Sequence, residues 1–312
     1  MHTMTLISAP KPFEDPFVAT IQDNALSSWS KLREVEILVV GEEAGIQEAA
    51  ERVGATHLRG VRRNESGTPL ISSMIDLARQ HGCGELLCVI NADMIITADL
   101  MDAARIAKTH ARKFVLLSRR WDLHIDERLD FSEGWERRLR ERVNQSGVLH
   151  RPAGSDYFVF PRDSYLSVPD FAVGRAGWDN WMICKARQSR WPVIDCTPAV
   201  IVVHQNHDYS HLPGGVPHYG MPESDENIRL AGGHAAIRYT ILDATHCLKA
   251  GRLVRPPVSF ARFLRGVELF LRTAFFFLPA QMIEEVARPK RWKKRFMRFI
   301  GRANGSADVP EN

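Results

Sequence analysis

The 312-residue sequence lacks several features that define well-known protein classes. Its five cysteines are odd in number and no two have C-x-x-C spacing, which argues against a disulfide framework and indicates reduced thiols in a cytosolic setting. No positively charged segment followed by an apolar one opens the chain, so we expect no targeting peptide. Internal repeats and low-complexity core segments are also missing.

Two nucleotide-binding motifs are missing as well. No G-x-G-x-x-G follows the first expected strand, Thr5–Ala9, which disfavours a dinucleotide-binding Rossmann protein. No G-x-x-x-x-G-K-[ST] occurs, which disfavours a Walker-type nucleoside triphosphatase. The longest apolar run, Ala274–Ile283, has 10 residues and contains Pro279. A membrane-spanning helix needs about 20 apolar residues, so this run does not cross a bilayer.

The charge is unevenly distributed along the chain. From Gly251 onward there are 13 Lys and Arg against 5 Asp and Glu, a net of +8, whereas the whole chain has 41 against 37, a net of +4. The first 250 residues therefore carry a net charge of −4. A basic tail on a slightly acidic body points to an anionic surface, either a membrane or a nucleic acid.

Strand-like and helix-like segments alternate in the first part of the chain. This rhythm predicts an α/β fold with a mostly parallel central sheet and helices on both faces. The expected strands are Thr5–Ala9, Glu36–Val40, Thr56–Leu58, Glu85–Ile90, Phe114–Ser118, Asp156–Pro161 and Val200–Val203. The expected helices are Pro16–Trp29 after an Asp15 N-cap, Ile46–Val53, a helix from Thr68 and Pro69 to Gln80, Leu100–Thr109, Glu133–Asn144, Trp178–Arg187 and Phe260–Phe299.

The tripeptide Asn91-Ala92-Asp93, with two polar residues, directly follows an expected buried strand. Ligands of parallel sheets bind at the carboxyl ends of the strands, where a carboxylate can meet a hard divalent cation. The simpler interpretation is a turn, because Asn and Asp are common after strands.

Three histidines, His204, His207 and His211, lie within eight residues after the last apolar strand. Imidazole is a common transition-metal ligand, so one carboxylate and one histidine could hold Mn²⁺. Each histidine taken alone is better explained by hydrogen bonds within a loop, but the cluster as a whole favours a function.

Two tryptophans, Trp178 and Trp181, flank Asp179 at the start of an expected helix. Aromatic faces stack on sugars, and a carboxylate between them could act as a general base on a hydroxyl. The alternative is structural, because Asp is a normal residue at a helix N-terminus and Trp is often buried in the core. Arg62 and Arg63 precede another expected helix and could pair with phosphates, or be surface charges beside a turn.

Taken together, these motifs resemble the GT-A glycosyltransferases, the family 2-like superfamily. The resemblance covers about residues 3–211 and follows the order of the loop Ser8–Phe13, the acidic strand end Gly41–Glu43, Asn91–Asp93, Asp179 and His204. The run Gly177–Met182 is also similar to the WDDWM segment of N-acetylglucosaminyltransferase I, in which the first carboxylate is the base.

The resemblance implies a set of site residues. Asp179 would be the catalytic base of an inverting reaction, and Asp93, His204 and His207 would hold Mn²⁺ or Mg²⁺. The residues expected to bind the donor, a nucleotide-diphosphate sugar, are Ala9, Pro10, Lys11, Glu42, Arg63, Asn91, Ala92, Asp93, Asp156 and Trp178. The sequence departs from the family at Asn91, which replaces the first acid of the D-x-D motif, so that position could bind ribose or a metal-bound water.

The sequence thus predicts a metal-dependent glycosyltransferase that acts on a hydroxyl of a glycan or a lipid-linked acceptor. One alternative is a nucleotidyltransferase that makes sugar nucleotides, although the loop Ala9–Pro12 lacks the glycines such enzymes use to hold a triphosphate. The other is a non-catalytic glycan- or membrane-binding protein on the same fold.

The expected organisation is a catalytic domain over residues 1–250, a basic amphipathic helical extension over 251–300 and a disordered tail over 301–312. The extension carries a basic cluster from Arg288 to Arg298 with aromatic residues among it, as interfacial helices do. Peripheral contact with the inner face of a membrane is one interpretation, and packing of the apolar half on the catalytic domain is the other. Nucleic-acid binding is disfavoured because no recognition motif accompanies the charge.

Overall fold

The computed structural model describes residues 2–206 and 221–273. The chain divides into two units, Met1–Pro256 and Pro257–Asn312. In the second unit, the helix described is α8 (Phe260–Thr273), so the expected helix Phe260–Phe299 is seen over its first part and the remainder lies outside the described residues. The expected disordered tail over 301–312 also lies outside the described residues.

The first unit is built on a large sheet with the strand order β13-β12-β10-β6-β9-β4-β1-β2-β3. Its strands are β1 (Met4–Ser8), β2 (Val35–Val40), β3 (Thr56–Leu58), β4 (Leu86–Ile90), β6 (Val115–Leu117), β9 (Tyr157–Pro161), β10 (Val193–Asp195), β12 (His246–Lys249) and β13 (Arg252–Val254). Neighbouring strands run parallel except at β9, which is antiparallel to β4 and β6, and at β13, which is antiparallel to β12. The predicted mostly parallel sheet is confirmed. Because β13 closes this sheet, the expected domain boundary at residue 250 falls inside the β12–β13 hairpin.

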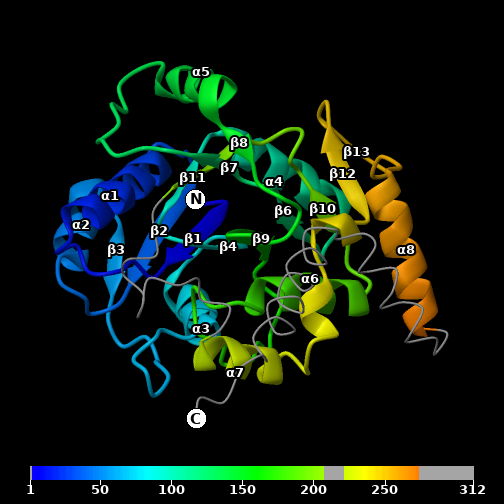
Figure 1. The fold of residues 1–312 in the computed structure, drawn as a ribbon. Coiled ribbons are helices and arrows are strands. Elements are labelled where there is room, and N and C mark those ends of the chain that lie inside the picture. The colour runs from blue at the N-terminus through cyan, green and yellow to red at the C-terminus, as the bar shows by residue number, and fades with distance from the viewer. Residues whose placement is uncertain (1, 207–220, 274–312) are drawn as a thin grey trace, which may run out of the picture. The chain divides into compact units, whose positions relative to one another are not determined.

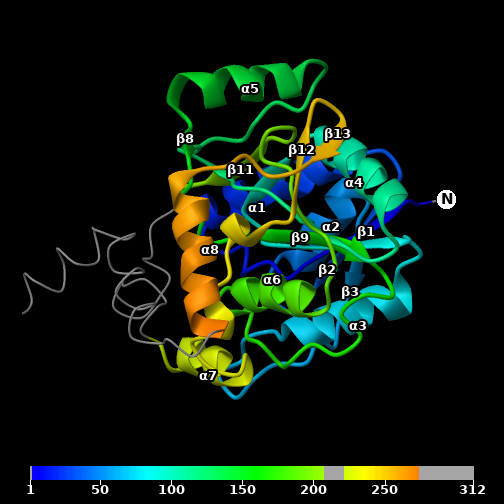
Figure 2. The same cartoon turned by 90° about the vertical axis from the view of Figure 1, so that its right-hand side faces the viewer.

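Helices cover both faces of the large sheet (Figures 1 and 2). The helices of this unit are α1 (Pro16–Ser30), α2 (Ile46–Val53), α3 (Ile71–His81), α4 (Asp99–His110), α5 (Trp135–Ser146), α6 (Trp178–Gln188) and α7 (Pro222–Leu230), with 3₁₀ turns η3 (Ala236–Arg238) and η4 (Ile241–Asp243). One apolar cluster packs α1, α2 and α4 on one face, and a second packs α3 and α6 on the other. The layered α/β prediction therefore holds.

Local sequence explains where several helices begin and end. The Asp15 side chain accepts hydrogen bonds from the backbone N–H of Phe17 and Val18, both at 2.9 Å, and Pro16 occupies the first helical position. Gly45 and Gly54 flank α2 and both adopt positive φ, 82° and 70°, which glycine tolerates without strain.

The predicted helix start at Thr68 and Pro69 is wrong. Helix α3 begins at Ile71, and its N-cap Leu70 makes no side-chain cap. Pro69 and Leu70 instead form isolated bridges with Arg63 and Ala172, so this segment is extended. Because these bridges hold Pro69 and Leu70 in an extended conformation, the helix does not begin at the residues that the local capping pattern indicates.

A small sheet with the order β5-β11-β7-β8 adjoins the large one. Its strands are β5 (Met94–Ile96), β7 (Trp121–Leu123), β8 (Val148–Leu149) and β11 (Val202–Gln205). Helix α5 packs on it through Leu139 and Val143, in a third apolar cluster. Strand β11 lies between β5 and β7, with His204 opposite Met94 on one side and Asp122 on the other.

Two buried amides hold β11 in place. Gln205 is fully buried; its Nε2 donates to the carbonyls of Ile21 (2.8 Å) and Asp93 (3.2 Å), and its Oε1 accepts from Asn24 Nδ2 (2.9 Å). Asn24 in turn accepts a hydrogen bond from Leu129 N at 2.9 Å. This amide pair connects α1, the turn at Asp93 and the end of β11.

We expect Asn24→Ala to lower the free energy of unfolding by on the order of 2–4 kcal/mol, because it leaves Gln205 Oε1 and Leu129 N buried without their partner. Urea unfolding followed by circular dichroism measures the change. Ser30→Ala, an exposed change in the same helix, should shift stability by less than about 0.5 kcal/mol. Equal midpoints for the two variants would show that the amide pair is not a stabilising connection.

Candidate active site at the carboxyl edge of the sheet

The loops after β1 and β4 lie at one edge of the large sheet, because these strands are parallel neighbours. Ser8, the last residue of β1, donates its hydroxyl to the carbonyl of Ile90, the last residue of β4, at 2.7 Å. Ala9, Pro10 and Lys11 follow the first strand and the Asn91–Asp93 tripeptide follows the second. The structure thus brings together these two sequence-predicted segments.

Asp156 joins the same edge because β9 runs antiparallel to β4, so that its first residues lie where β4 ends. Asn91 N donates to the Asp156 carbonyl at 2.9 Å, and Asn91 Nδ2 donates to Asp156 Oδ1, also at 2.9 Å. The asparagine at the first position of the motif therefore holds a second carboxylate at the site.

Asp93 and His204 face one another, as expected from their places in the sequence. The separation of Asp93 Oδ2 and His204 Nε2 is 3.5 Å, and the two side chains are 21% and 12% exposed. Strand register produces this contact, since His204 pairs with Met94, the residue after Asp93.

Asp122 and His150 extend the site beyond the residues that were predicted to form it. Asp122 Oδ1 lies 3.6 Å from His204 Nδ1, and Asp122 Oδ2 lies 2.6 Å from His150 Nδ1. Burial alone would raise the pKa of Asp122, but its hydrogen bond with His150 and the charge of Arg120 lower the pKa overall. The β7–β8 pairing places Asp122 beside this histidine. Because β8 has only two residues, this pairing could not be predicted from the sequence.

Arg120 connects two carboxylates of the site. Its Nε lies 2.9 Å from Asp122 Oδ1 and one terminal nitrogen lies 2.5 Å from Asp156 Oδ2. Burial would lower the pKa of Arg120, but the charges of Asp156, Asp122 and Asp93 raise it well above its usual value. Of the pair Arg119 and Arg120, only the second belongs to this network; Arg119 donates to the carbonyls of Leu149 and His150.

Asp179 lies beside Asp156 and is the most strongly perturbed carboxyl of the site. Burial raises the pKa of Asp179 to about 6, and the charge of Asp156 adds to this, although backbone N–H groups that include Ser155 N oppose it. The N-cap of α6 is Gly177 rather than Asp179, so the capping interpretation does not account for this carboxylate.

Lys11 and Arg175 supply positive charge near the acids. Lys11 is an exposed residue, yet protein surrounding its amine desolvates it and lowers its pKa; Asp93 opposes that shift and Arg175 adds to it. Arg175 is held by Glu223, with 2.6 Å between its Nε and the carboxylate.

The expected nucleoside residues Glu42 and Arg63 differ in their surroundings. Arg63 pairs with Glu43 at 2.7 Å and donates to the Gly67 carbonyl at 2.8 Å, whereas Glu42 is exposed. Burial would raise the pKa of Glu43, but Arg63 lowers it overall. The acid at the end of β2 that engages the arginine is therefore Glu43, which sequence reasoning did not select.

Trp178 occupies the core instead of facing a sugar. It is 3% exposed and packs edge-on against Phe158, with 5.3 Å between the ring centroids. We therefore leave Trp178 out of the donor site. His207, the other expected metal ligand besides Asp93 and His204, lies outside the described residues.

Asp93 and His204 fit a hard divalent cation as a two-ligand set. Such an ion takes one or two protein carboxylates and completes its shell with phosphates and water. Ligand atoms on neighbouring octahedral positions lie about 3 Å apart, close to the separation seen here. Within residues 2–206 and 221–273, no group of three or more His, Cys, Asp or Glu side chains gathers to hold a metal. Protein side chains alone thus do not complete a shell in this part of the chain.

No protein-family model matches the chain, and no curated protein matches it by sequence. The solved structures similar to it include glycosyltransferases. Residues 1–349 of Staphylococcus aureus TarS are 22% identical, over 43% of this chain and 40% of that chain, with a TM-score of 0.31. This chain thus covers less than half of that one.

Two further similar structures cover more of the chain. Glucosyl-3-phosphoglycerate synthase from Mycobacterium tuberculosis, solved with Mn²⁺, UDP-glucose and phosphoglyceric acid, is 14% identical over 83% of this chain and 88% of that one, with a TM-score of 0.43. The mannosyltransferase PcManGT from Pyrobaculum calidifontis, solved with GDP-Man and Mn²⁺, is 15% identical over 99% and 76%, with a TM-score of 0.46. These likenesses concern the fold alone, and the function is argued below from the site.

Proposed function

We propose that the protein is a metal-dependent glycosyltransferase that moves a sugar from a nucleotide-diphosphate donor to an acceptor hydroxyl with inversion. The observation that supports this most strongly is the gathering of Asp93, His204, Asp156 and Asp179 at the carboxyl edge of the sheet, with Lys11 beside them. A base with a raised pKa and a two-ligand cation set are the parts that such a transfer needs.

Asp179 would act on the acceptor. In the proposed step the acceptor hydroxyl gives its proton to Asp179 while its oxygen forms a bond to the anomeric carbon. The bond from that carbon to the diphosphate breaks, and the electron pair leaves with the nucleoside diphosphate. A pKa of about 6 keeps the carboxylate ionised at neutral pH and still basic enough to take the proton.

Asp93 and His204 would hold the divalent cation, which when bound supplies positive charge to the departing diphosphate. Lys11 would contact the same phosphates, because its amine is near Asp93 and an anionic partner would offset the desolvation that lowers its pKa. Ala9 and Pro10, with Arg63, Glu42 and the neighbouring Glu43, would bind the nucleoside side of the donor.

We expect Asp93→Ala to abolish metal-dependent nucleotide binding, because it removes the carboxylate ligand and leaves His204 as the described protein ligand. Titration calorimetry with UDP and with GDP, each with and without Mn²⁺, measures this. Asp99→Ala, a change at the start of α4, serves as the matched loss of a carboxylate and should bind nucleotide as the parent does. Unchanged nucleotide–metal affinity in Asp93→Ala would show that the metal site is elsewhere.

We expect Asp179→Asn to lose roughly 10²- to 10⁴-fold in turnover while it still binds donor, because the amide cannot take the proton. The assay is release of nucleoside diphosphate from a panel of nucleotide sugars with Mn²⁺. It also tests the nucleotidyltransferase alternative, which would release pyrophosphate from a nucleoside triphosphate and a sugar phosphate.

The pH dependence follows from the raised pKa. Donor-saturated turnover of the parent should rise with pH through about 6, as Asp179 loses its proton. The folded state binds this proton more tightly than the unfolded chain does, so the contribution of Asp179 to stability is present at low pH and is lost as pH rises through about 6. Asp179→Asn should therefore be no less stable than the parent at pH 7.5. Near-normal turnover in this variant would remove Asp179 as the base.

The acceptor class is a finer proposal, which rests on α8. Phe260, Phe263 and Phe270 are 74%, 61% and 68% exposed and follow one another at helical spacing, so they form one apolar stripe. On another side of the helix Arg265 and Glu268 pair at 2.7 Å. With the basic cluster Arg288–Arg298 further along the sequence, this stripe suits an interfacial helix on an anionic membrane and a lipid-linked or envelope-glycan acceptor.

No helix among residues 2–206 and 221–273 has the length and apolar character needed to cross a bilayer. We propose that the catalytic domain comprises the first unit, which ends at Pro256, and that the basic extension after it, up to about residue 300, contacts the membrane peripherally and is followed by the tail 301–312. Nucleic acid is not part of the proposal.

We expect the full-length chain to co-sediment with vesicles that contain phosphatidylserine at low salt and to be released at high salt. The double variant Phe263→Ser and Phe270→Ser should lower the partition coefficient at least tenfold, because the exposed rings lose apolar contact with the bilayer. Truncation after Arg288 should lower it as well, through the lost basic residues. Binding that both changes leave intact, or no binding at all, would contradict the membrane role without affecting the proposed chemistry.

A further inference from the structure

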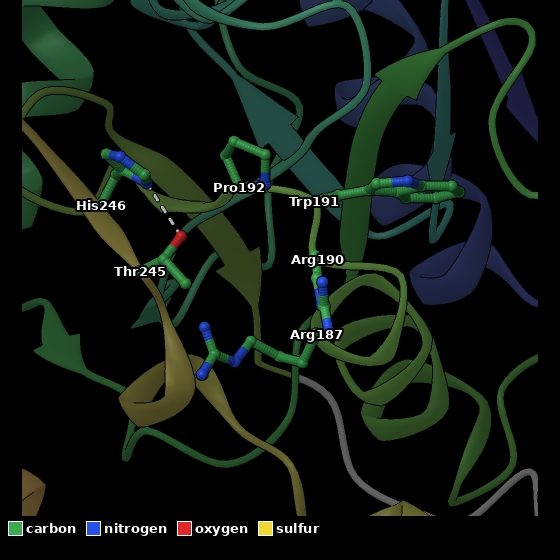
Figure 3. Close-up of a pocket in the computed structure, with 6 residues that line it drawn as sticks. All are labelled: Arg187, Arg190, Trp191, Pro192, Thr245 and His246. Carbon is green, nitrogen blue, oxygen red and sulfur yellow. Dashed lines mark hydrogen bonds between the residues drawn. The ribbon is translucent and has the colours of Figure 1, made fainter.

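A second pocket lies at the opposite edge of the large sheet from the candidate active site. It has a volume of about 280 Å³ and is lined by Arg187, Arg190, Trp191, Pro192, Thr245 and His246 (Figure 3). Trp191 and Pro192 directly precede β10, and His246 opens β12. Because β10 and β12 run parallel to one another, these residues gather at the amino ends of the strands. The proposed donor and metal residues lie at the carboxyl ends.

The lining of this pocket is positively charged. Arg187 and Arg190 are exposed, and within the described residues no carboxylate lies in ion-pair distance of either guanidinium. Arginines elsewhere, such as Arg63, Arg120 and Arg175, are held by acids. Two unneutralised guanidinium groups around one small cavity form a site for an anion.

The backbone of Arg190 is strained at this pocket. Arg190 adopts a φ of 58°, just after the C-cap residue Ser189 of α6, at a position where glycine is the usual residue. The turn is otherwise regular, with Arg190 N donating to the Arg187 carbonyl at 3.1 Å and Trp191 N donating to the Ala186 carbonyl at 2.9 Å. A non-glycine residue at such a position costs stability, as it does at Glu34, Tyr165 and Ala250, which also adopt positive φ.

The remaining walls are fixed by their own contacts. Thr245 Oγ1 accepts a hydrogen bond from Val193 N at 2.9 Å and lies 2.8 Å from His246 Nδ1. The rings of His246 and His110 meet edge-on with 4.8 Å between centroids. Lys113 places its amine 5.5 Å from the Trp191 ring centroid. The pocket is therefore held by β10, β12 and α4 together and adds a hydroxyl and an imidazole to the two arginines.

We propose that this pocket binds a phosphoryl group of a small phosphorylated molecule, at a site separate from the donor site. Guanidinium groups recognise phosphate oxygens in pairs, and the His246 ring, whose Nδ1 is held by the Thr245 hydroxyl, lies beside them. The volume suits a compact ligand of the size of pyrophosphate or a phosphate monoester. This inference does not depend on the proposed glycosyl transfer.

Inorganic pyrophosphate is the test probe, titrated by calorimetry into the full-length chain without divalent cation. The parent and Asp93→Ala should bind it equally, because the pocket is at the other edge of the sheet. Arg187→Ala and Arg190→Gly should each bind at least tenfold more weakly, since each loses a charge-assisted hydrogen bond. Arg137→Ala, an exposed arginine on α5 removed for the same change in net charge, should bind as the parent does.

Arg190→Gly separates a lost ligand contact from a damaged fold. Glycine relieves the positive φ, so the variant should melt at the same temperature as the parent or higher while it loses the anion. The proposal is overturned if the parent shows no saturable binding up to millimolar pyrophosphate. It is also overturned if Arg187→Ala and Arg190→Gly bind as tightly as Arg137→Ala, or if binding is lost in Asp93→Ala instead.

Discussion

The side-chain amide of Gln205 determines how the two halves of the candidate site meet. Its nitrogen donates to the carbonyls of Ile21 and Asp93, and its oxygen accepts from Asn24, so that a helix, a turn and a strand end share one buried group. Because side chains alternate along a strand, a slip of β11 by one residue would turn His204 away from Asp93 and expose this amide. Burial of a polar group without its partners is costly, and this cost enforces the register.

The contacts of Arg120 with the acids around it are the second feature that arranges this edge of the sheet. Asp122, Asp156 and Asp93 lie in partly buried positions, and Arg120 lies among all three. Two of these acids are thereby committed to structure. Asp179 differs, because no arginine contacts it among the described residues and burial dominates its protonation. The same edge thus contains carboxylates that lie beside a cation and one carboxyl, Asp179, whose pKa is raised by burial.

Sequence reasoning recovered the elements that have strong local signals. Helix α2 was bounded correctly, with glycine on either side of it, and the start of α1 was correct because Asp15 caps it and Pro16 is its first residue. Strands of two to four residues, such as β7, β8, β10 and β12, were missed, since so short a segment has no measurable period. The Asp93–His204 pair was predicted through family resemblance, whereas His150 was not, because only the pairing of β7 with β8 places it. Trp178 was predicted to bind the donor but is buried, because the sequence around a tryptophan at a helix start does not show whether its ring faces a ligand or the core.

The reversed direction of β9 has a consequence for how this fold can diversify. A parallel strand brings only the chain that follows it to the carboxyl edge, but β9 brings the chain that precedes it, and this chain includes Ser155 and Asp156. The segment between β7 and β9 therefore enters the site from a direction of its own, apart from the loops after β1 and β4. Insertions or exchanges there would reshape one side of the site while the loops after β1 and β4 keep their places on their own strands. Two parts of one recognition surface can in this way be inherited and modified separately within one continuous chain.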